Sequence, residues 1–205
     1  MAGDRIRLGV LVSGRGSNLQ AIIDAIETGY LPAEIAVVIS NYRGVLALER
    51  AERHGIKTAV FEWADFGSRV KQQRAILECL RHYDVDLVVL AGFDRVIGKE
   101  LLEAYSGRII NIHPSLLPAF GGGLHAQADA LEYGVKVSGC TVHFVTEDVD
   151  SGPIILQKAV PVLDSDTAES LAARILAEEH KILPEAIRLI AQGRVRIEGR
   201  RTRIL

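Results

Sequence analysis

Arg7-Leu-Gly-Val-Leu-Val-Ser13 is followed directly by Gly14-Arg-Gly-Ser-Asn18 and then by Leu19-Gln-Ala-Ile-Ile-Asp-Ala-Ile-Glu27. The apolar run in the first segment is typical of a strand that is buried on both faces, as in a parallel sheet. Apolar residues recur at helical spacing in the third segment. This stretch therefore predicts a strand, a glycine-rich turn and a helix, which is the repeating unit of α/β folds.

The same alternation continues to residue 111. Strands are predicted at 34–39, 57–61, 85–91 and 109–111, and helices at 45–54, 65–82 and 99–105. The pattern indicates an α/β protein with a right-handed, doubly wound, mostly parallel Rossmann-like sheet and helices on both faces.

The pattern changes after Pro118. A helix is predicted at 125–133, a pair of antiparallel strands at 137–145 and 154–162, and a long amphipathic helix at 168–191 that Pro184 kinks or divides. Asp166-Thr167 is the expected cap of that helix. The basic segment 194–205 has a hairpin turn at Glu198-Gly199, and its charges are most simply a solvated edge. We interpret residues 1–205 as one domain with two halves, 1–110 and 111–205.

Composition excludes several classes of protein. The chain has 205 residues, 48% of them apolar, and a net charge of -2, which gives no reason to expect bulk electrostatic binding to nucleic acid or to a membrane. The first apolar run is too short for a membrane span or a standard signal peptide, so we expect a cytoplasmic protein. Cys79 and Cys140 lack CxxC spacing and are expected to be reduced and buried. No His/Cys cluster has the spacing of metal ligands.

Three polar clusters follow predicted strands: Gly14 to Asn18, Phe93 to Arg95, and Asn111 to His113. In a doubly wound sheet the carboxyl ends of these strands share one rim, where ligands bind. The glycine turn before a helix suits a phosphate, because the first helical N–H groups and the helix dipole face it. The alternative is a tight turn in which Ser17 or Asn18 caps the helix.

Asn111, His113 and Asp150 suit the transfer of an acyl-level carbon to an amine. The Asn111 amide and a protonated His113 are donors for the oxyanion of a tetrahedral intermediate. Asp150 is a partner for His113 and can help to remove the proton from the amine. No Ser or Cys stands in an elbow motif, which favours direct transfer without a covalent enzyme intermediate. The alternative is a capped turn at Asn111 and a surface His113. His143, on a predicted strand, is interpreted as a core or cross-strand residue.

Arg69 stands in the first turn of a predicted helix, where a cation is unfavourable next to the positive end of the dipole. A bound anion in front of Arg69 resolves this conflict. An arginine that reaches solvent is the simpler alternative.

Four motifs carry a resemblance to a known family: Ser13-Gly-Arg-Gly-Ser-Asn-Leu-Gln-Ala-Ile22, Leu90-Ala-Gly-Phe93 with Arg95, Asn111-Ile-His-Pro-Ser-Leu-Leu-Pro118, and Gly139 to Gln157 with Asp150-Ser-Gly-Pro153. Nearly end to end, the chain resembles the phosphoribosylglycinamide formyltransferases, purine-pathway enzymes that use 10-formyltetrahydrofolate. The resemblance implies the formyltransferase fold, with a phosphate-binding first half and a folate-binding, catalytic second half.

The resemblance also implies roles for single residues. Glycinamide ribonucleotide and a reduced folate would be the ligands of a monomer or homodimer, without a metal ion. Catalysis would fall to Asn111, His113 and Asp150. The ribonucleotide would be bound by Gly16, Ser17, Asn18, Arg69 and Glu179, and the folate by Arg95, Val96, Ile97, Asn111, Val145 and Asp150. The resemblance does not say whether His125 contacts substrate.

Two positions depart from the family pattern. Asp94 stands where the family usually has an apolar residue, often Met, and a carboxylate there should weaken the binding of an anionic ligand or redirect a side chain. Phe120-Gly-Gly-Gly-Leu-His125 lacks the usual proline and is one glycine longer, which predicts a more mobile loop that closes on substrate.

Other functions remain open at this point. Methionyl-tRNA and nucleotide-sugar formyltransferases carry extra domains, for which 205 residues leave no room, and a formyltetrahydrofolate hydrolase would carry a leading regulatory domain. A non-catalytic folate- or nucleotide-binding module is favoured only by Asp94 and by the altered glycine loop.

Overall fold

Strand β1 (Ile6–Val12) is an inner strand of the first of two compact units in the computed structural model, which describes residues 5–205. Its neighbours are β2 (Ala33–Ser40) and β4 (Leu87–Leu90), both parallel to it. Leu8, Val10, Leu11 and Val12 are fully buried, as an apolar strand covered on both faces requires. The short strand β3 (Thr58–Val60) pairs in parallel with β2.

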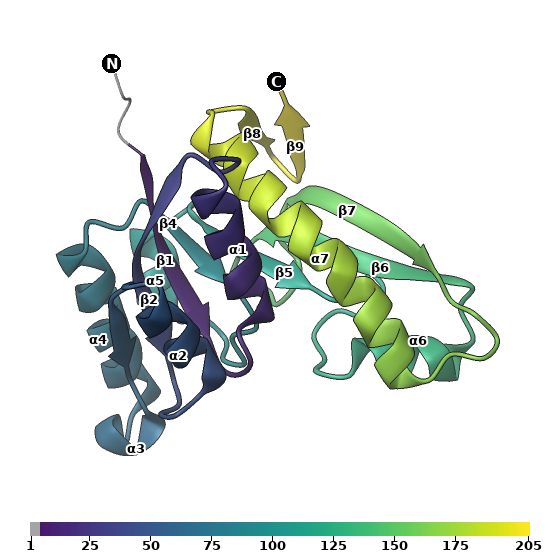
Figure 1. Ribbon diagram of the computed structural model, residues 1–205, viewed down its shortest axis with the longest axis horizontal. Coiled ribbons are helices and arrows are strands. Elements are labelled where there is room, and N and C mark those ends of the chain that lie inside the picture. Colours follow the sequence, from purple (N-terminus) through teal and green to yellow (C-terminus); the bar gives the residue numbers. More distant parts are fainter. Residues whose placement is uncertain (1–4) are drawn as a thin grey trace. The chain divides into compact units, whose positions relative to one another are not determined.

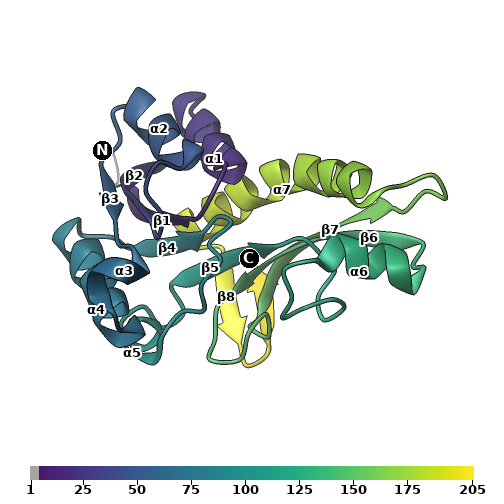
Figure 2. The same ribbon diagram turned by 90° about the horizontal axis from the view of Figure 1, so that it is seen from below.

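Helices follow the strands of the first unit as the alternation predicts. They are α1 (Ser17–Glu27), α2 (Leu46–Arg53), α3 (Trp63–Phe66), α4 (Arg69–His82) and α5 (Lys99–Ala104). Figure 2 shows α1 and α2 on one face of the strands and α3 to α5 on the other. The first unit is therefore doubly wound.

The second unit, Asn111–Leu205, combines an antiparallel strand pair with a long helix. Its elements are α6 (Ala126–Tyr133), β6 (Val137–Phe144), β7 (Ile154–Pro161), α7 (Ala168–Ala191), β8 (Val195–Glu198) and β9 (Arg201–Ile204). Helix α7 packs along β6 and β7 (Figure 1), and α6 packs against α7. β8 and β9 form a separate antiparallel hairpin.

Hydrogen bonding gives the strand order β3-β2-β1-β4-β5-β6-β7 in a seven-stranded sheet, and the chain passes from the first unit to the second inside β5 (Ile109–His113). β6 and β7 are antiparallel, as predicted. The expected fold class, a mostly parallel α/β sheet with an antiparallel strand pair, is confirmed.

Several predicted boundaries are wrong for identifiable reasons. The long helix predicted from residue 65 is two helices, because Gly67 adopts a left-handed conformation (φ 59°) that ends α3 before α4 begins at Arg69. Pro184 does not divide α7, which is one helix. Thr167 caps α7 together with Ser170, as expected for this position. Neither Ser17 nor Asn18 is the cap of α1, because Gly16 holds that place and offers no side chain.

The two cysteines are free thiols. Cys140 is buried on β6, and burial raises the pKa of its thiol to about 12, with the nearby carboxylates of Glu179 and Glu178 acting in the same direction. Within residues 5–205 no helix is long and apolar enough to cross a membrane.

Gly9→Ala tests the packing around β1. A Cβ at this position would overlap the Leu80 side chain and lie 3.1 Å from Val85 Cγ1. We expect the free energy of unfolding, measured with urea, to fall by about 1–3 kcal/mol, the usual cost of overpacking. Gly14→Ala is the control, since its Cβ would meet no atom within 4 Å. Equal effects of the two substitutions would contradict this account.

Candidate active site

Asn111 and His113 both lie on β5, which continues two residues beyond the predicted strand end. The strand runs up to Pro114 because an extended conformation is the one that a residue before proline prefers. Alternate residues of a strand point to the same face. The two side chains therefore project side by side from one rigid element.

The loop after His113 is fixed by a hydrogen-bond network. Thr141 Oγ1 donates to the Ser115 carbonyl at 2.7 Å and accepts from the Leu117 N–H at 3.1 Å. Gln157 Nε2 donates to the Leu117 carbonyl and to Thr141 Oγ1, each at 3.0 Å. The Ser115 hydroxyl, fully buried, donates to the Ala119 carbonyl at 2.5 Å. β6 and β7 thus hold the backbone that follows β5.

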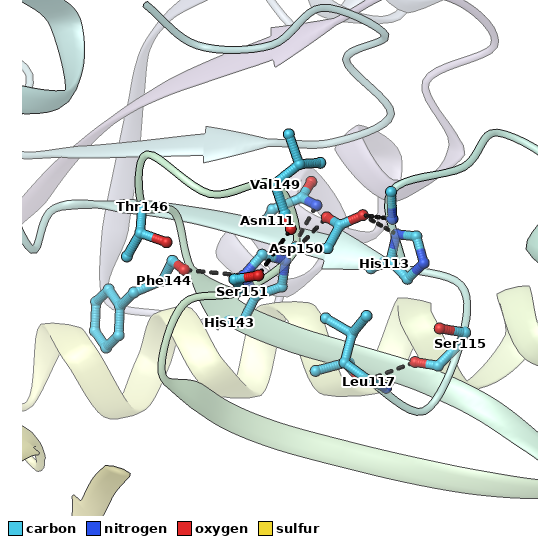
Figure 3. Close-up of polar contacts among 12 residues, drawn as sticks. Asn111, His113, Ser115, Leu117, His143, Phe144, Thr146, Val149, Asp150 and Ser151 are labelled. Atoms are coloured by element: carbon cyan, nitrogen blue, oxygen red, sulfur yellow. Dashed lines mark hydrogen bonds and ion pairs between the residues drawn. The ribbon is translucent and has the colours of Figure 1, made fainter. Parts of the chain in front are cut away.

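The Asp150 carboxylate lies between two imidazoles (Figure 3). Its Oδ2 is 3.3 Å from His113 Nδ1, and its Oδ1 is 3.5 Å from His143 Nε2. The Gly122 N–H donates to Oδ2 at 2.8 Å. The three residues that the sequence selects, Asn111, His113 and Asp150, are therefore gathered within the second unit, together with a histidine that it did not select.

The backbone around Asp150 is unusual. Asp150 has a φ of 50°, in the left-handed region that Asp tolerates better than most residues. Gly152 follows it, and a Cβ there would overlap the Phe144 carbonyl oxygen at the end of β6. The turn between β6 and β7 can therefore close tightly only with glycine at 152.

His143 was interpreted as a core or cross-strand residue, and it is indeed buried on β6, with 1% of its surface exposed. It also belongs to the polar cluster. Its Nδ1 lies 2.9 Å from the Phe144 carbonyl, so Nδ1 carries the proton. Nε2 lies 3.3 Å from Asn111 Nδ2 and 3.5 Å from Asp150 Oδ1, so it accepts from the amide when it is unprotonated and donates to the carboxylate when it is protonated. No sequence spacing signals the contact with Asn111, because 32 residues separate the partners.

Burial by itself would raise the pKa of Asp150, whose side chain is 11% exposed. The bond with His143, the Gly122 N–H and the charge of His113 outweigh this effect and hold the pKa below its ordinary value. The group is therefore a carboxylate at neutral pH.

Both nitrogens of His113 face acceptors. Nδ1 faces Asp150, and Nε2 lies 2.9 Å from the Phe120 carbonyl, which can only accept. Nε2 therefore carries a proton, and a second proton on Nδ1 would complete the ion pair with Asp150. Phe120 itself has a φ of 54° and Gly122 a φ of 77°. The glycine loop thus contacts the cluster twice, through the Phe120 carbonyl and the Gly122 N–H.

The glycine turn of the first unit is built for close backbone approach. Gly16 is the left-handed N-cap of α1 (φ 70°), and a Cβ on it would lie 2.6 Å from Ala47 Cβ. Ser17 and Asn18 are the first two residues of α1. The first N–H groups of α1 have no partners within the helix, so the N-terminus of α1 can bind an anion.

Arg69 is the first residue of α4, and its guanidinium contacts a carbonyl. Nη2 donates to the Val96 carbonyl at 2.8 Å, and Gln73 Nε2 donates to the same oxygen at 3.2 Å. Gln73 Oε1 in turn accepts from the Gly98 N–H at 2.9 Å. Sequence reasoning did not find this link between α4 and the segment 95–97. Val96 is half exposed and Ile97 is buried.

Two further predicted ligand contacts lie in the second unit. Glu179 is buried on α7, with 7% of its surface exposed, and Val145 directly follows β6. His125 is the residue before α6. No group of three or more His, Cys, Asp or Glu side chains within residues 5–205 is arranged to hold a metal ion.

A sequence model of the formyl transferase family matches residues 6–187. The chain belongs to this family. Phosphoribosylglycinamide formyltransferase of Escherichia coli (strain K12) is 44% identical over 188 residues, which are 92% of this chain and 88% of that protein. The crystal structure of glycinamide ribonucleotide transformylase 1 from Symbiobacterium toebii has a TM-score of 0.96 and 58% identity and covers 98% of this chain and 94% of its own. Within the family, the chain therefore groups with the phosphoribosylglycinamide formyltransferases, which confirms the resemblance.

The family also occurs within longer proteins. The trifunctional purine biosynthetic protein adenosine-3 of Homo sapiens is 48% identical over 193 residues, which are 94% of this chain and 19% of that protein. The chain thus spans about a fifth of the length of this curated relative.

Asp150→Asn tests the electrostatic account of the cluster. A carboxylate whose pKa is lowered by folding stabilises the folded state above its unfolded pKa, and this contribution is lost as the pH falls through the folded pKa. Asn keeps the tolerance for the left-handed backbone and removes the charge. We expect the difference in free energy of unfolding between the native protein and the variant to shrink as the pH is lowered from about 5 to about 2.

Urea unfolding at a series of pH values measures that difference. A difference that stays constant over this range would show that folding does not lower the pKa of Asp150. Asp164→Asn provides a comparison for a surface ion pair, because the Asp164 side chain is 92% exposed and bonds Lys136.

Proposed function

We propose that the chain transfers the formyl group of 10-formyltetrahydrofolate to the amine of glycinamide ribonucleotide, a step of purine biosynthesis. The observation that carries the proposal is the contact of Asp150 with His113, next to Asn111, in a member of the formyl transferase family. The amine nitrogen forms a bond to the formyl carbon, and the bond from that carbon to N10 of the folate breaks. The amine loses a proton, and N10 gains one.

Asn111 is the proposed donor for the oxyanion of the tetrahedral intermediate. When His143 Nε2 is unprotonated, one hydrogen of the Asn111 amide is directed to it, which leaves the second hydrogen for the substrate oxygen. A donor already oriented by a buried partner needs no reorganisation during the reaction, and such a donor contributes about 3–4 kcal/mol in well-studied enzymes. His143 is then the residue that orients Asn111.

His113 is the second proposed donor, and its contacts set a condition on the mechanism. Nδ1 faces Asp150 and Nε2 faces the Phe120 carbonyl, so the oxyanion has to replace one of these acceptors. The Phe120 carbonyl belongs to the glycine loop, whose movement would release Nε2 without breaking the ion pair. Such a movement requires the mobile glycine loop that the sequence predicts to close on substrate.

Asp150 is the proposed proton acceptor. It is ionised at neutral pH and would take the proton of the attacking amine directly or through water while it stabilises a charged His113. His113 and Asp150 then titrate as a coupled pair. The proposed mechanism uses no metal ion, because Asn111 and His113 supply the positive ends of the dipoles that the oxyanion needs.

The remaining contacts are proposals for the two ligands. We assign the phosphate of the ribonucleotide to the N-terminus of α1, with Arg69 and Glu179 as further contacts. We assign the folate to the segment Arg95 to Ile97 and to the backbone from Val145 to Asp150. We expect a cytoplasmic monomer or homodimer.

A turnover assay with both substrates tests the proposal. The protein is incubated with 10-formyltetrahydrofolate and glycinamide ribonucleotide, and loss of the formyl group is followed with and without the ribonucleotide. Loss that requires the ribonucleotide is the expected result. Loss without it would replace the proposal with a hydrolase, and retained binding without turnover would replace it with a binding module.

Asn111→Ala and Asp150→Asn test the assigned roles. We expect kcat to fall about 10²–10³-fold for Asn111→Ala, the usual cost of one oxyanion donor. For Asp150→Asn we expect a fall of about 10²–10⁴-fold, the usual contribution of a general base. KM should change less than kcat, because both groups act mainly in the transition state. Asp164→Asn, a change at an exposed ion pair of the same unit, is the control.

Initial rates, measured with one substrate varied while the other is saturating, give kcat and the KM of each substrate. If either catalytic substitution instead changed mainly KM, its residue would have a binding role and not the transition-state role assigned here.

Gly122→Ala tests the contact between the glycine loop and Asp150. Alanine at a φ of 77° is strained, which should weaken the bond from the residue 122 N–H to Asp150 Oδ2. Loss of a donor to the carboxylate raises its pKa, so the acid limb of the pH profile of kcat/KM should move to higher pH. Gly123→Ala is the matched comparison, since Gly123 has no positive φ. An unchanged acid limb in Gly122→Ala would argue against this contact.

A further inference from the structure

Asp94 departs from the family pattern, and its side chain is the centre of a hydrogen-bond network in the first unit. Oδ1 accepts from Asn41 Nδ2 at 2.8 Å, and Oδ2 accepts from the Tyr42 hydroxyl at 2.9 Å. The Asp94 N–H donates to Ser13 Oγ at 3.0 Å. These partners directly follow β1 and β2, whereas Asp94 follows β4. Asp94 thus joins the carboxyl ends of three parallel strands through its carboxylate and its N–H.

The network closes on itself. Ser13 Oγ, which accepts from the Asp94 N–H, donates to Asn41 Oδ1 at 2.6 Å, and the amide of the same Asn41 donates back to Asp94. Asn41 is 3% exposed, so its amide has little access to water and depends on these partners. A network that satisfies each member in this way fixes its geometry.

Arg95 is oriented by the same group. Its Nη2 donates to the Tyr42 hydroxyl at 3.1 Å, its Nε lies 3.5 Å from Asp94 Oδ1, and its guanidinium lies 6.0 Å from the centre of the Tyr42 ring. The Asp94 charge therefore faces donors and a cation. A carboxylate at this position was expected either to weaken the binding of an anionic ligand or to redirect a side chain, and these contacts match the second expectation.

The segment Arg95 to Ile97 is held from both sides. On one side, Asp94 precedes the segment and is anchored by its own hydrogen bonds. On the other side, Arg69 and Gln73 bond the Val96 carbonyl, and Gln73 also bonds the Gly98 N–H. Between these anchors, the Arg95 side chain is 51% exposed and Val96 is 50% exposed. An apolar and a cationic side chain are thus presented to solvent on a backbone of fixed shape, which lowers the entropy lost when a ligand binds.

We propose that Asp94 is a positioning residue that preorganises the segment Arg95 to Ile97 for the folate co-substrate. The inference rests on the proposed function, because that function assigns the folate to this segment. Asp94 acts through its neighbours and does not touch the reacting atoms. Its removal should therefore affect the binding of folate more than the chemical step.

The ribonucleotide should be affected less. Ser13, which leads into the glycine turn, keeps its backbone bond to the Gly92 carbonyl at 3.0 Å and its hydroxyl bond to Asn41 when the Asp94 side chain is removed. Removal of the Asp94 side chain should therefore change the KM for folate more than the KM for the ribonucleotide.

Asp94→Ala, Asp94→Asn and Asp65→Ala are the variants for the test. For Asp94→Ala we expect the KM for 10-formyltetrahydrofolate to rise about tenfold, since bonds of ordinary strength to Asn41 and Tyr42 are lost. We expect kcat and the KM for the ribonucleotide to change by less than about twofold, because Asp94 does not touch the reacting atoms and the phosphate is assigned to the N-terminus of α1. Asp94→Asn should restore the folate KM, since its amide can accept from Asn41 and donate to the Tyr42 oxygen.

Asp65→Ala is the matched control, because it removes a carboxylate of the same unit that is bonded to Arg43 at 2.7 Å. Its folate KM should equal that of the native protein. The proposal is overturned if Asp94→Ala leaves the folate KM unchanged, if it raises both KM values equally, or if it lowers kcat alone, as general damage to the fold would do.

Hydrogen exchange of the ligand-free protein separates this inference from the proposed function. The amides of residues 95–98 should exchange faster in Asp94→Ala than in the native protein, in Asp94→Asn and in Asp65→Ala. Faster exchange together with an absence of formyl transfer by the native protein would refute the proposed function and leave the anchoring role of Asp94 standing. Unchanged exchange would refute the anchoring role whatever the assay shows.

Discussion

A carboxylate that is almost buried must find partners for its charge, and the second unit of the chain is arranged to supply them to Asp150. Two imidazoles and one backbone N–H surround it. Without them the cost of removing the charge from water would favour the protonated acid. The requirement explains why His143 lies beside His113, and why the glycine loop turns a backbone N–H towards the cluster.

The same requirement shapes the backbone. Asp150 occupies a left-handed conformation, and the chain after it passes so close to Phe144 that only glycine fits at 152. On the other side, Thr141 and Gln157 hold the loop that follows His113 through its carbonyl and N–H groups. Side chains on a strand whose neighbouring loop is hydrogen-bonded in this way have little freedom to leave their positions.

Much of the fold follows from periodicity along the sequence. Apolar runs of strand length alternate with helical spacing up to residue 110, and this alternation specifies a doubly wound parallel sheet. The selection of Asn111, His113 and Asp150 also needs only local reasoning, because each stands beside residues that constrain the backbone. Their contact does not follow from local reasoning, since β5 and the turn after β6 are distant in sequence.

Other features depend on contacts that no local pattern contains. His143 resembles any buried strand residue until its Asn111 partner is known, and Arg69 resembles a misplaced cation until the Val96 carbonyl is found in front of it. Asp94 was the clearest case, because the sequence could not say which side chain its carboxylate would redirect, and its donors Asn41 and Tyr42 come from another strand end. Such pairings are set by the tertiary fold.

The close approach at Gly152 bears on how sequence variation in this chain is interpreted. A larger residue there would push the β6–β7 turn outward and carry Asp150 with it, although Gly152 has no side chain and performs no chemistry. Loss of function at this position in a saturation mutagenesis experiment would therefore mimic the signature of a catalytic residue. Substitution of Gly152 would not be tolerated because a side chain there would occupy the space of the Phe144 carbonyl oxygen.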